Sequence, residues 1–214
     1  MNIGILISGN GSNLQALIDA CNSGVIPAKI AVVISNKSTA FGLERAKKAG
    51  IATVVLSHKD YISRDEYDTA LTATLEQHGV SFVCLAGFMR LLTPAFTQAW
   101  HDRLINIHPS LLPSFKGLDT HARAIAAGVK FTGCTVHFVR PAMDEGPIII
   151  QAVVPVLQDD TPETLAARVF PFEHQCYVEA LRIIAMGGYK IVEEKVILDK
   201  PSTISQSLIH PFTK

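Results

Sequence analysis

The chain has 214 residues, of which 48% are hydrophobic, so it is long enough to bury the core of one large domain. Lysine and arginine together number 19, as do aspartate and glutamate, and this balance argues against the broad positive surface that nucleic-acid binding requires. The longest apolar run, 147–157, is too short to span a bilayer, so no membrane-spanning segment is expected.

Met1 leads directly into an apolar strand-like run rather than into a basic and apolar leader, so no secretion signal is expected. The cysteines are scattered and form no Cys-x-x-Cys pair, which fits a reducing, cytoplasmic location. They are Cys21, Cys84, Cys134 and Cys176.

The first half of the chain alternates short apolar runs, typical of strands, with runs of helical periodicity. Strands are predicted at 3–8, 29–35, 52–56, 81–86 and 103–107, and helices at 13–22, 41–49, 64–78 and 94–100. Repeated strand–helix order implies a parallel sheet with right-handed crossovers.

The pattern changes after residue 130. The runs 131–139 and 148–156 are predicted strands, separated by a looped or antiparallel excursion, and a long helix follows from Pro162 to about Met186. The sequence therefore predicts a single α/β domain with a Rossmann-like, mostly parallel twisted sheet. Helices should cover both faces, and the C-terminal part should be mixed or antiparallel.

The segment from Asn106 to Pro113 contains the strongest functional pattern. Side chains alternate along a strand, so Asn106 and His108 should point to the same face while Ile107 points to the other. Histidine can exchange a proton near neutral pH, and an asparagine amide can stabilise an oxyanion. The alternative is that both side chains cap the end of a strand through local backbone bonds.

The loop from Ser8 to Asn13 joins the first strand to the first helix. Its glycines allow close backbone approach, and the following helix start offers free N–H groups, which together suit a phosphate. The loop lacks the Gly-Lys-Ser/Thr of a Walker motif and the third glycine of a dinucleotide fingerprint. A single phosphate on a small substrate fits best, and the alternative is a tight turn with a helix cap.

Asp144 lies between the two late strands, in the segment Met143-Asp144-Glu145-Gly146-Pro147. This composition is ordinary for a turn, but a carboxylate there could also support a nearby protonated imidazole. Its position after a strand makes contact with His108 possible. His121 and His137 are alternative imidazoles, and His137 could either buttress the site or be a satisfied core histidine.

Four segments together resemble the phosphoribosylglycinamide formyltransferases, folate-dependent enzymes of purine biosynthesis. The segments are 8–14, 86–90, 106–113 and 144–147. The resemblance spans roughly residues 1–190 and implies that they form a formyltransferase domain. Residues 191–214 are then expected to be a C-terminal strand and polar tail of the same domain. The implied reaction transfers a formyl group from 10-formyltetrahydrofolate to the primary amine of 5'-phosphoribosylglycinamide.

The resemblance implies a role for each site residue. Asn106, His108 and Asp144 would be catalytic. Substrate would bind to Gly11, Ser12, Asn13 and Glu173, and folate to Arg64, Met89, Arg90, Leu91, Leu92, Asn106, Arg140, Pro141, Ala142, Met143 and Asp144. The co-substrate would be 10-formyltetrahydrofolate. No metal is expected, because the sequence contains no metal-binding motif such as His-Glu-x-x-His.

Other functions share parts of this pattern. A formyltetrahydrofolate hydrolase would use the same three catalytic residues but normally carries an additional N-terminal module. A formyltransferase acting on transfer RNA would need a further domain and a basic surface. A non-catalytic binder of a phosphorylated metabolite would leave Asn106, His108 and Asp144 unexplained. The expected partner is the small-molecule substrate alone, bound to a monomer or a homodimer.

Overall fold

The computed structural model describes residues 1–199, and most of the predicted polar tail lies outside these residues. A seven-stranded sheet has the order β3-β2-β1-β4-β5-β6-β7. Its strands are β1 (Asn2–Ile7), β2 (Lys29–Ser35), β3 (Ala52–Val55), β4 (Phe82–Leu85), β5 (Leu104–His108), β6 (Phe131–Phe138) and β7 (Ile148–Pro155). The first five strands pair in parallel, whereas β6 runs antiparallel to both β5 and β7.

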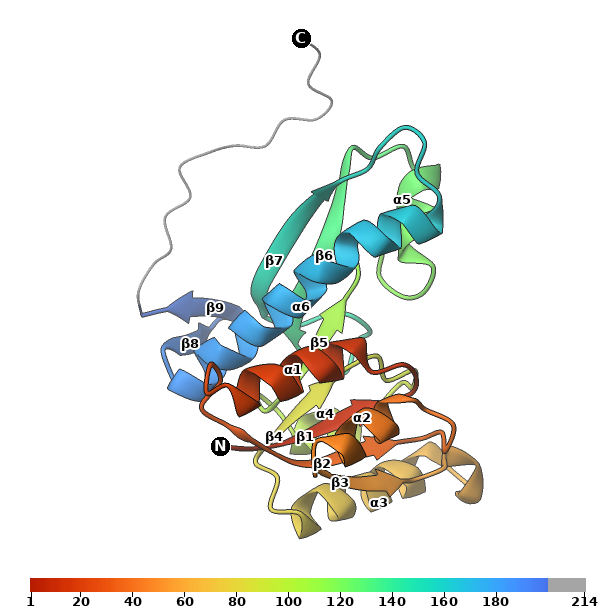
Figure 1. Ribbon diagram of the computed structural model, residues 1–214. Helices are drawn as coiled ribbons and strands as arrows, with labels where there is room; N and C mark the ends of the chain where they lie inside the picture. The colour runs from red at the N-terminus through yellow and green to blue at the C-terminus, as the bar shows by residue number, and fades with distance from the viewer. Residues whose placement is uncertain (200–214) are drawn as a thin grey trace.

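Five helices and a 3-10 turn connect these strands, and a sixth helix follows β7 (Figure 1). They are α1 (Ser12–Asn22), α2 (Gly42–Lys48), η1 (His58–Asp60), α3 (Arg64–Gln77), α4 (Pro94–Ala99), α5 (Thr120–Ala126) and α6 (Pro162–Met186). Each of the predicted strands and helices is present, with its ends shifted by at most one residue. The long α6 continues through Pro171, as the predicted range required.

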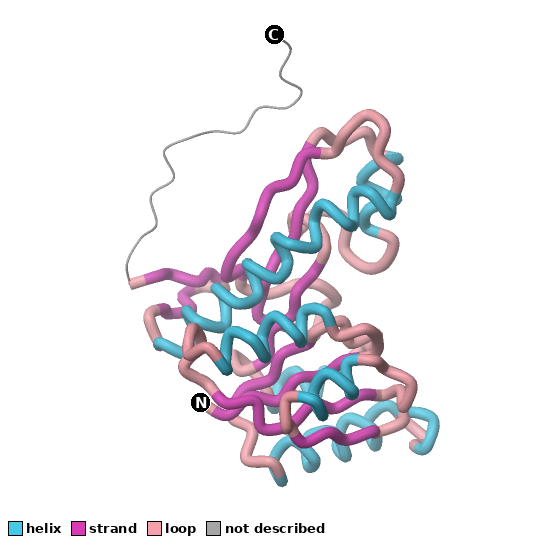
Figure 2. Tube along the Cα trace, viewed as in Figure 1, coloured by secondary structure: helices cyan, strands magenta, loops and turns pink. Residues whose placement is uncertain are grey.

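Two hydrophobic clusters pack on opposite faces of the sheet. Alternate strand residues such as Ile5, Cys84 and Ile105 join α1, α2 and α6 in the larger cluster. The intervening residues, such as Leu6 and Leu104, join α3 and α4 in the smaller one. Figure 2 shows helices on both sides of the strands, which confirms the predicted layered fold.

The strand order changes direction between β1 and β4. From β1 the chain moves outward to β2 and β3, and it then returns to place β4 on the other side of β1. At such a switch point the loops after the two central strands diverge and leave a crevice at the carboxyl edge of the sheet. The loops that follow β1 and β4, at 8–11 and 86–93, therefore flank the natural ligand position of this fold.

Three short elements were not predicted from the sequence. Helix α5 has only seven residues, and η1 is a single turn. Strands β8 (Tyr189–Val192) and β9 (Lys195–Leu198) form a separate hairpin where a single C-terminal strand was expected. Its turn uses Glu193 and Glu194 at positive φ, without the Gly or Asn that usually identifies such a turn. The expected boundary at residue 191 falls inside β8.

Tyr177 of α6 links the helix layer to the strands beneath the site. Its buried hydroxyl donates to the carbonyl oxygen of Leu85 at 2.9 Å. We predict that Tyr177→Phe lowers the free energy of unfolding by about 0.5–1.5 kcal/mol, because a buried hydrogen bond is lost without a large cavity. Urea unfolding should show a lower midpoint at unchanged slope, and an unchanged midpoint would contradict the assigned bond.

Candidate active site

Strand β5 presents an apolar side and a polar side. Ile105 and Ile107 are buried in the cluster that includes α6. Asn106 and His108 point to the opposite face, as the alternation of a strand predicts. On this polar side His108 is 5% exposed, whereas Asn106 is only partly buried.

Asp144 reaches His108 by a route that the sequence did not reveal. We expected contact because both residues follow strands, but β6 is antiparallel to β5, and Phe138 pairs with Ile105 near the start of β5. The ends of β5 and β6 therefore lie at opposite edges of the sheet. The loop 139–147 spans that distance by folding back along β5, which brings Asp144 Oδ1 within 3.5 Å of His108 Nδ1.

The other ring nitrogen of His108 also meets an oxygen. Its Nε2 lies 3.0 Å from the carbonyl oxygen of Phe115, and a carbonyl can only accept, so Nε2 carries a hydrogen. The Asp144 carboxylate is held in turn by the backbone N–H of Gly117, which donates to Oδ2 at 2.7 Å. The segment 115–117 thus orients both members of the pair, and sequence patterns did not identify it.

His137 lies opposite Asn106 in the β5–β6 ladder. The His137 Nδ1 donates to the carbonyl oxygen of Phe138 at 2.9 Å, which leaves the Nε2 lone pair facing Asn106 Nδ2 at 3.5 Å. Burial lowers the pKa of His137, which favours the neutral form of the ring. The amide of Asn106 therefore turns its NH₂ group toward His137. Of the two alternatives for His137, this geometry favours the buttress.

The loop after β1 leads directly into the first turn of α1. Gly11 occupies the N-cap position with φ 73°, and no side chain caps the helix. The first N–H groups of a helix have no partners within the helix, and the helix dipole makes this end favourable for an anion. Gly11, Ser12 and Asn13 therefore form an uncapped helix start, and their binding of a phosphate stays a prediction.

Asn13 and Glu173 meet beside this loop although 160 residues separate them. Asn13 Nδ2 donates to Glu173 Oε2 at 3.0 Å, and both side chains are buried. Burial raises the pKa of Glu173 above the usual carboxyl value, although the bond from Asn13 opposes this shift. The Asn13 Oδ1 atom is buried without a hydrogen-bond partner among the described residues. It is therefore available to accept from a ligand.

Ser8 connects the loop after β1 to the segment 89–92. Its hydroxyl accepts from the backbone N–H of Met89 at 2.8 Å and donates to Asn36 Oδ1 at 2.6 Å. Met89 and Leu91 are 63% and 59% exposed, which is unusual for large apolar side chains and suits a ligand-binding wall. Neither Ser8 nor Asn36 was predicted as a site residue.

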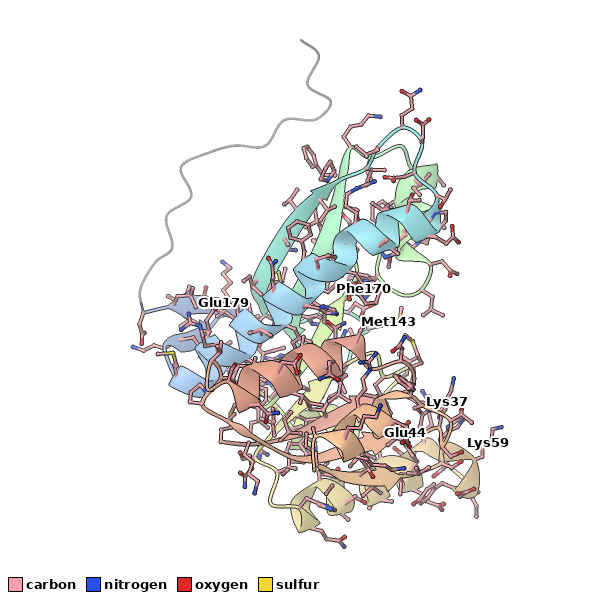
Figure 3. The ribbon with its side chains drawn as sticks, in the orientation of Figure 1. Lys37, Glu44, Lys59, Met143, Phe170 and Glu179 are labelled. Atoms are coloured by element: carbon pink, nitrogen blue, oxygen red, sulfur yellow. The ribbon has the colours of Figure 1, made fainter. Side chains whose placement is uncertain are left out.

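The remaining predicted residues are placed less uniformly. Met143, labelled in Figure 3, is half exposed in the 139–147 loop, where Pro141 and Ala142 are also exposed. The guanidinium of Arg140 is occupied by Glu194 and Asp102, with N–O distances of 2.7 and 2.8 Å. Arg64 begins α3 and is exposed. Within residues 1–199, no hydrogen bond or ion pair joins Arg64 to the rest of the site.

Arg90 and Leu92 complete the predicted folate wall and are both half-buried. The Arg90 Nε atom is buried without a hydrogen-bond partner in the described part of the chain. Leu92 packs against the smaller hydrophobic cluster. Leu92 therefore contributes to the core, as its alternative interpretation suggested, while Arg90 retains an unused donor.

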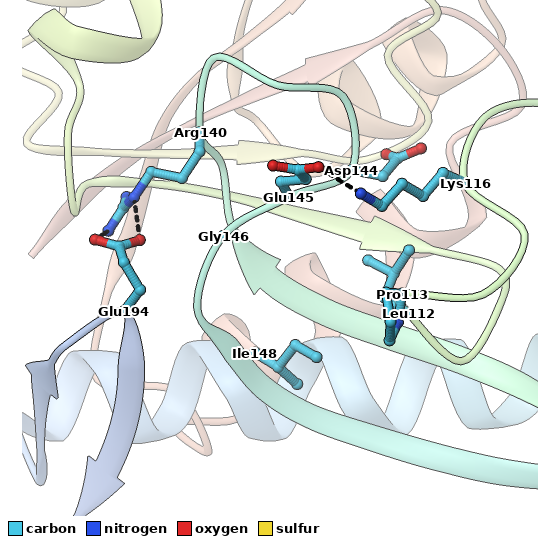
Figure 4. A pocket seen from close by; sticks show the side chains of 9 residues that line it. All are labelled: Leu112, Pro113, Lys116, Arg140, Asp144, Glu145, Gly146, Ile148 and Glu194. Atoms are coloured by element: carbon cyan, nitrogen blue, oxygen red, sulfur yellow. Dashed lines mark hydrogen bonds and ion pairs between the residues drawn. The ribbon is translucent and has the colours of Figure 1, made fainter.

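A cavity of about 380 Å³ opens beside Asp144 (Figure 4). Leu112, Pro113 and Ile148 line its apolar part. The ion pairs Lys116–Glu145 and Arg140–Glu194 cross its rim, with the first at 2.6 Å. These two ion pairs join the loop that carries Asp144 to the segment 115–117 on one side and to the β8–β9 hairpin on the other.

Residues 1–199 contain neither a candidate metal site nor a membrane-spanning helix. No group of three or more His, Cys, Asp or Glu side chains there could hold a metal ion. Among the described helices, none has both the length and the apolar character needed to cross a membrane.

Comparisons with known proteins agree with the fold and with the family that the sequence resembles. Residues 1–181 match the formyl transferase family. The phosphoribosylglycinamide formyltransferase of Escherichia coli (strain K12) is 48% identical over 199 residues, covering 93% of this chain and 94% of that protein. The crystal structure of glycinamide ribonucleotide transformylase 1 from Symbiobacterium toebii has a TM-score of 0.91 at 49% identity, and the match covers 92% of this chain and 93% of that one.

Larger relatives contain the same unit. The human trifunctional purine biosynthetic protein adenosine-3 is 49% identical over 191 residues, and the match covers 89% of this chain. The chain spans only 14–19% of the length of the trifunctional relatives. The chain belongs to the formyl transferase family. The resemblance to phosphoribosylglycinamide formyltransferases that the sequence predicted is confirmed.

The raised pKa of Glu173 has a consequence for stability. The folded protein holds the Glu173 proton more tightly than the unfolded chain does. The stability that this group contributes is therefore greatest below the pKa of the unfolded chain, and it is lost as pH rises through the raised pKa of the folded protein. In the wild type this group should lower the melting temperature as pH rises through the carboxyl titration range. We predict that Glu173→Gln makes this fall smaller, because the variant has no carboxyl group to titrate there. Calorimetry of both proteins against pH measures this, and parallel curves would exclude a raised pKa.

Proposed function

We propose that this protein transfers the formyl group of 10-formyltetrahydrofolate to the primary amine of 5'-phosphoribosylglycinamide. The observation that carries the proposal is the pairing of His108 with Asp144, whose Nδ1 and Oδ1 atoms lie 3.5 Å apart, with Asn106 on the same face of β5 as His108. A site that only binds a phosphorylated metabolite has no need of the buried imidazole and its carboxylate. The membership in the formyl transferase family supports the same reaction.

The chemistry follows from the donors on the polar side of β5. The substrate amine attacks the formyl carbon, and the carbonyl oxygen becomes the oxyanion of a tetrahedral intermediate. Asn106 Nδ2 donates to that oxygen, and the Nε2–H of His108 does so when it exchanges the Phe115 carbonyl for the oxyanion. His108, supported by the Asp144 carboxylate, then assists proton transfer to the N10 leaving group as the carbon–nitrogen bond breaks.

The two substrates occupy the loops on either side of this centre. The phosphate of 5'-phosphoribosylglycinamide binds the N–H groups of Gly11, Ser12 and Asn13, and Glu173 accepts from the ribose or the glycinamide end. The pterin lies against 89–92 and 140–144, with Arg64 at its anionic tail. Because Arg140 is already paired, the contribution of its segment comes mainly from backbone groups.

Residues 1–190 are proposed as the catalytic domain, with 191–214 as part of the same unit. The ion pair between Arg140 and Glu194 supports this, because it joins the loop that carries Asp144 to the β8–β9 hairpin. The cytoplasmic location and the choice between monomer and homodimer stay predictions.

A direct assay tests the proposed function. The protein is mixed with 10-formyltetrahydrofolate, with and without 5'-phosphoribosylglycinamide, and the folate absorbance and the formylated product are followed. Product formation that requires both substrates is expected. Folate release with formate as the product would indicate a hydrolase, and binding of the ribonucleotide without turnover would indicate a non-catalytic protein.

The catalytic pair can be tested by a double-mutant cycle. We predict a loss in kcat of about 10²–10⁴-fold for His108→Ala and about 10²–10³-fold for Asn106→Ala. The double variant should lose much less than the product of the two, since both donors act on one intermediate. Multiplicative losses would instead assign the residues to different steps.

The anion-binding loop can be tested through Gly11. A Cβ at this position would lie 2.7 Å from the Gly42 Cα, and φ 73° disfavours any other residue. We predict that Gly11→Val weakens binding of 5'-phosphoribosylglycinamide by roughly 10–100-fold, the effect of losing charge-assisted hydrogen bonds, and leaves folate binding nearly intact. Calorimetric titration of each ligand measures this.

Gly24→Val is the matched control, because Gly24 also has a positive φ of 78° but nothing within 4 Å of the added Cβ. The control should bind both ligands normally. Equal weakening of both ligands in Gly11→Val would mean general damage to the fold. Normal binding of both would reduce the loop to a turn.

A further inference from the structure

Helix α2 lies directly against the anion-binding loop. The backbone N–H of Gly42, the first residue of α2, donates to the carbonyl oxygen of Gly9 at 3.1 Å. A Cβ on Gly42 would lie 3.2 Å from the Gly11 Cα and 2.5 Å from Ile7 Cδ1. The two glycines therefore allow a backbone contact, and α2 forms the outer support of the loop.

Arg45, at the next turn of α2, extends this support with its side chain. Its Nε donates to the Asn10 carbonyl oxygen at 2.9 Å, and its Nη2 donates to Asn10 Oδ1 at 2.9 Å. The third nitrogen, Nη1, donates to Gln15 Oε1 at 3.3 Å. The Phe41 ring stacks 4.9 Å from the guanidinium carbon and restricts its plane. One planar fork thus ties the loop to α1 and α2.

The bond to the Asn10 carbonyl also determines where the next N–H points. The Asn10–Gly11 peptide is planar and trans, so its C=O and N–H point in opposite directions. Holding the carbonyl toward Arg45 turns the Gly11 N–H away from α2. The guanidinium also adds a permanent positive charge beside the loop, which favours an anion bound there.

We propose that Arg45 is the positioning residue of the anion-binding loop. It sets the direction of the Gly11 N–H and supplies the positive charge that the loop itself lacks, and it thereby determines affinity for the phosphate of the substrate. This inference rests on the proposed function, because it assigns to Arg45 a role in binding the phosphorylated substrate. It predicts that loss of Arg45 weakens binding of 5'-phosphoribosylglycinamide but not of folate, and that the loss is confined to the phosphate group.

The primary experiment compares Arg45→Gln with Lys47→Gln. Lys47 is on the same helix but pairs at 2.9 Å with Glu44, which is labelled on the exposed face in Figure 3, so its loss removes an equal charge away from the loop. Arg45→Gln should raise the KM for 5'-phosphoribosylglycinamide by roughly 10–100-fold, with kcat and the KM for folate nearly unchanged. Lys47→Gln should behave as the wild type.

A second arm identifies the phosphate as the group involved. With the dephosphorylated riboside as substrate, wild type and Arg45→Gln should have similar kcat/KM, because the group that Arg45 serves is absent. Arg45→Lys, which keeps the charge but not the fork, should recover part of the lost affinity. An equal loss with both substrates, an unchanged KM, or an equal effect of Lys47→Gln would overturn the inference.

The arms also separate this inference from the proposed function. If the wild-type protein forms no product from either substrate, the proposed function fails, and binding of inorganic phosphate then tests Arg45 alone. Titration of inorganic phosphate into the wild type and into folded Arg45→Lys should show weaker binding by the variant. Equal phosphate affinity in the two proteins would reject the role of Arg45.

Discussion

The site depends on the position of β5 at the junction between parallel and antiparallel strands. On one side β5 pairs in parallel with β4, and on the other it pairs antiparallel with β6. The parallel side aligns the end of β5 with the loops after β1 and β4. The antiparallel side supplies His137 opposite Asn106 and returns the chain through the loop that carries Asp144. Both halves are needed, because each contributes groups that the other lacks.

Burial of polar groups explains how this arrangement stays specific. An unpaired buried donor or acceptor costs free energy, so each must have a partner or await a ligand. His108 and Asp144 are oriented by the backbone of 115–117, and Asn106 by His137. Asp144 accepts a positive φ of 51° in this position. Seven buried side-chain atoms of the described residues have no partner, and two of them, Asn13 Oδ1 and Arg90 Nε, belong to residues proposed to bind the substrates.

Hydrogen bonds connect the loop after β1, proposed to bind the phosphate, to the segment 89–92, proposed to bind the folate. Ser8 bonds the Met89 backbone and Asn36, so the ends of β1, β2 and β4 are held as one unit. Helix α2 holds the other side of the loop after β1 through Gly42 and Arg45. The relative placement of the two loops is therefore set largely by hydrogen bonds from the side chains of Ser8 and Arg45.

The sequence by itself determined the order of elements and indicated which side chains to propose as reactive. Short apolar runs identified the main strands, because the central strands are buried on both faces, and helical periodicity identified the helices. The sequence also placed Asn106 and His108 on one face, since alternation is a local property of a strand. Short elements without such a pattern, α5 and the β8–β9 hairpin, were missed.

Only the tertiary structure decided which distant residues meet. The contacts between Asp144 and His108, Asn13 and Glu173, and Arg45 and Asn10 join residues 36, 160 and 35 positions apart. These distances depend on strand order, on the antiparallel turn of β6 and on how helices pack across the sheet. None of these leaves a periodic trace in one sequence, because they arise from the packing of whole elements and not from the preference of any one segment.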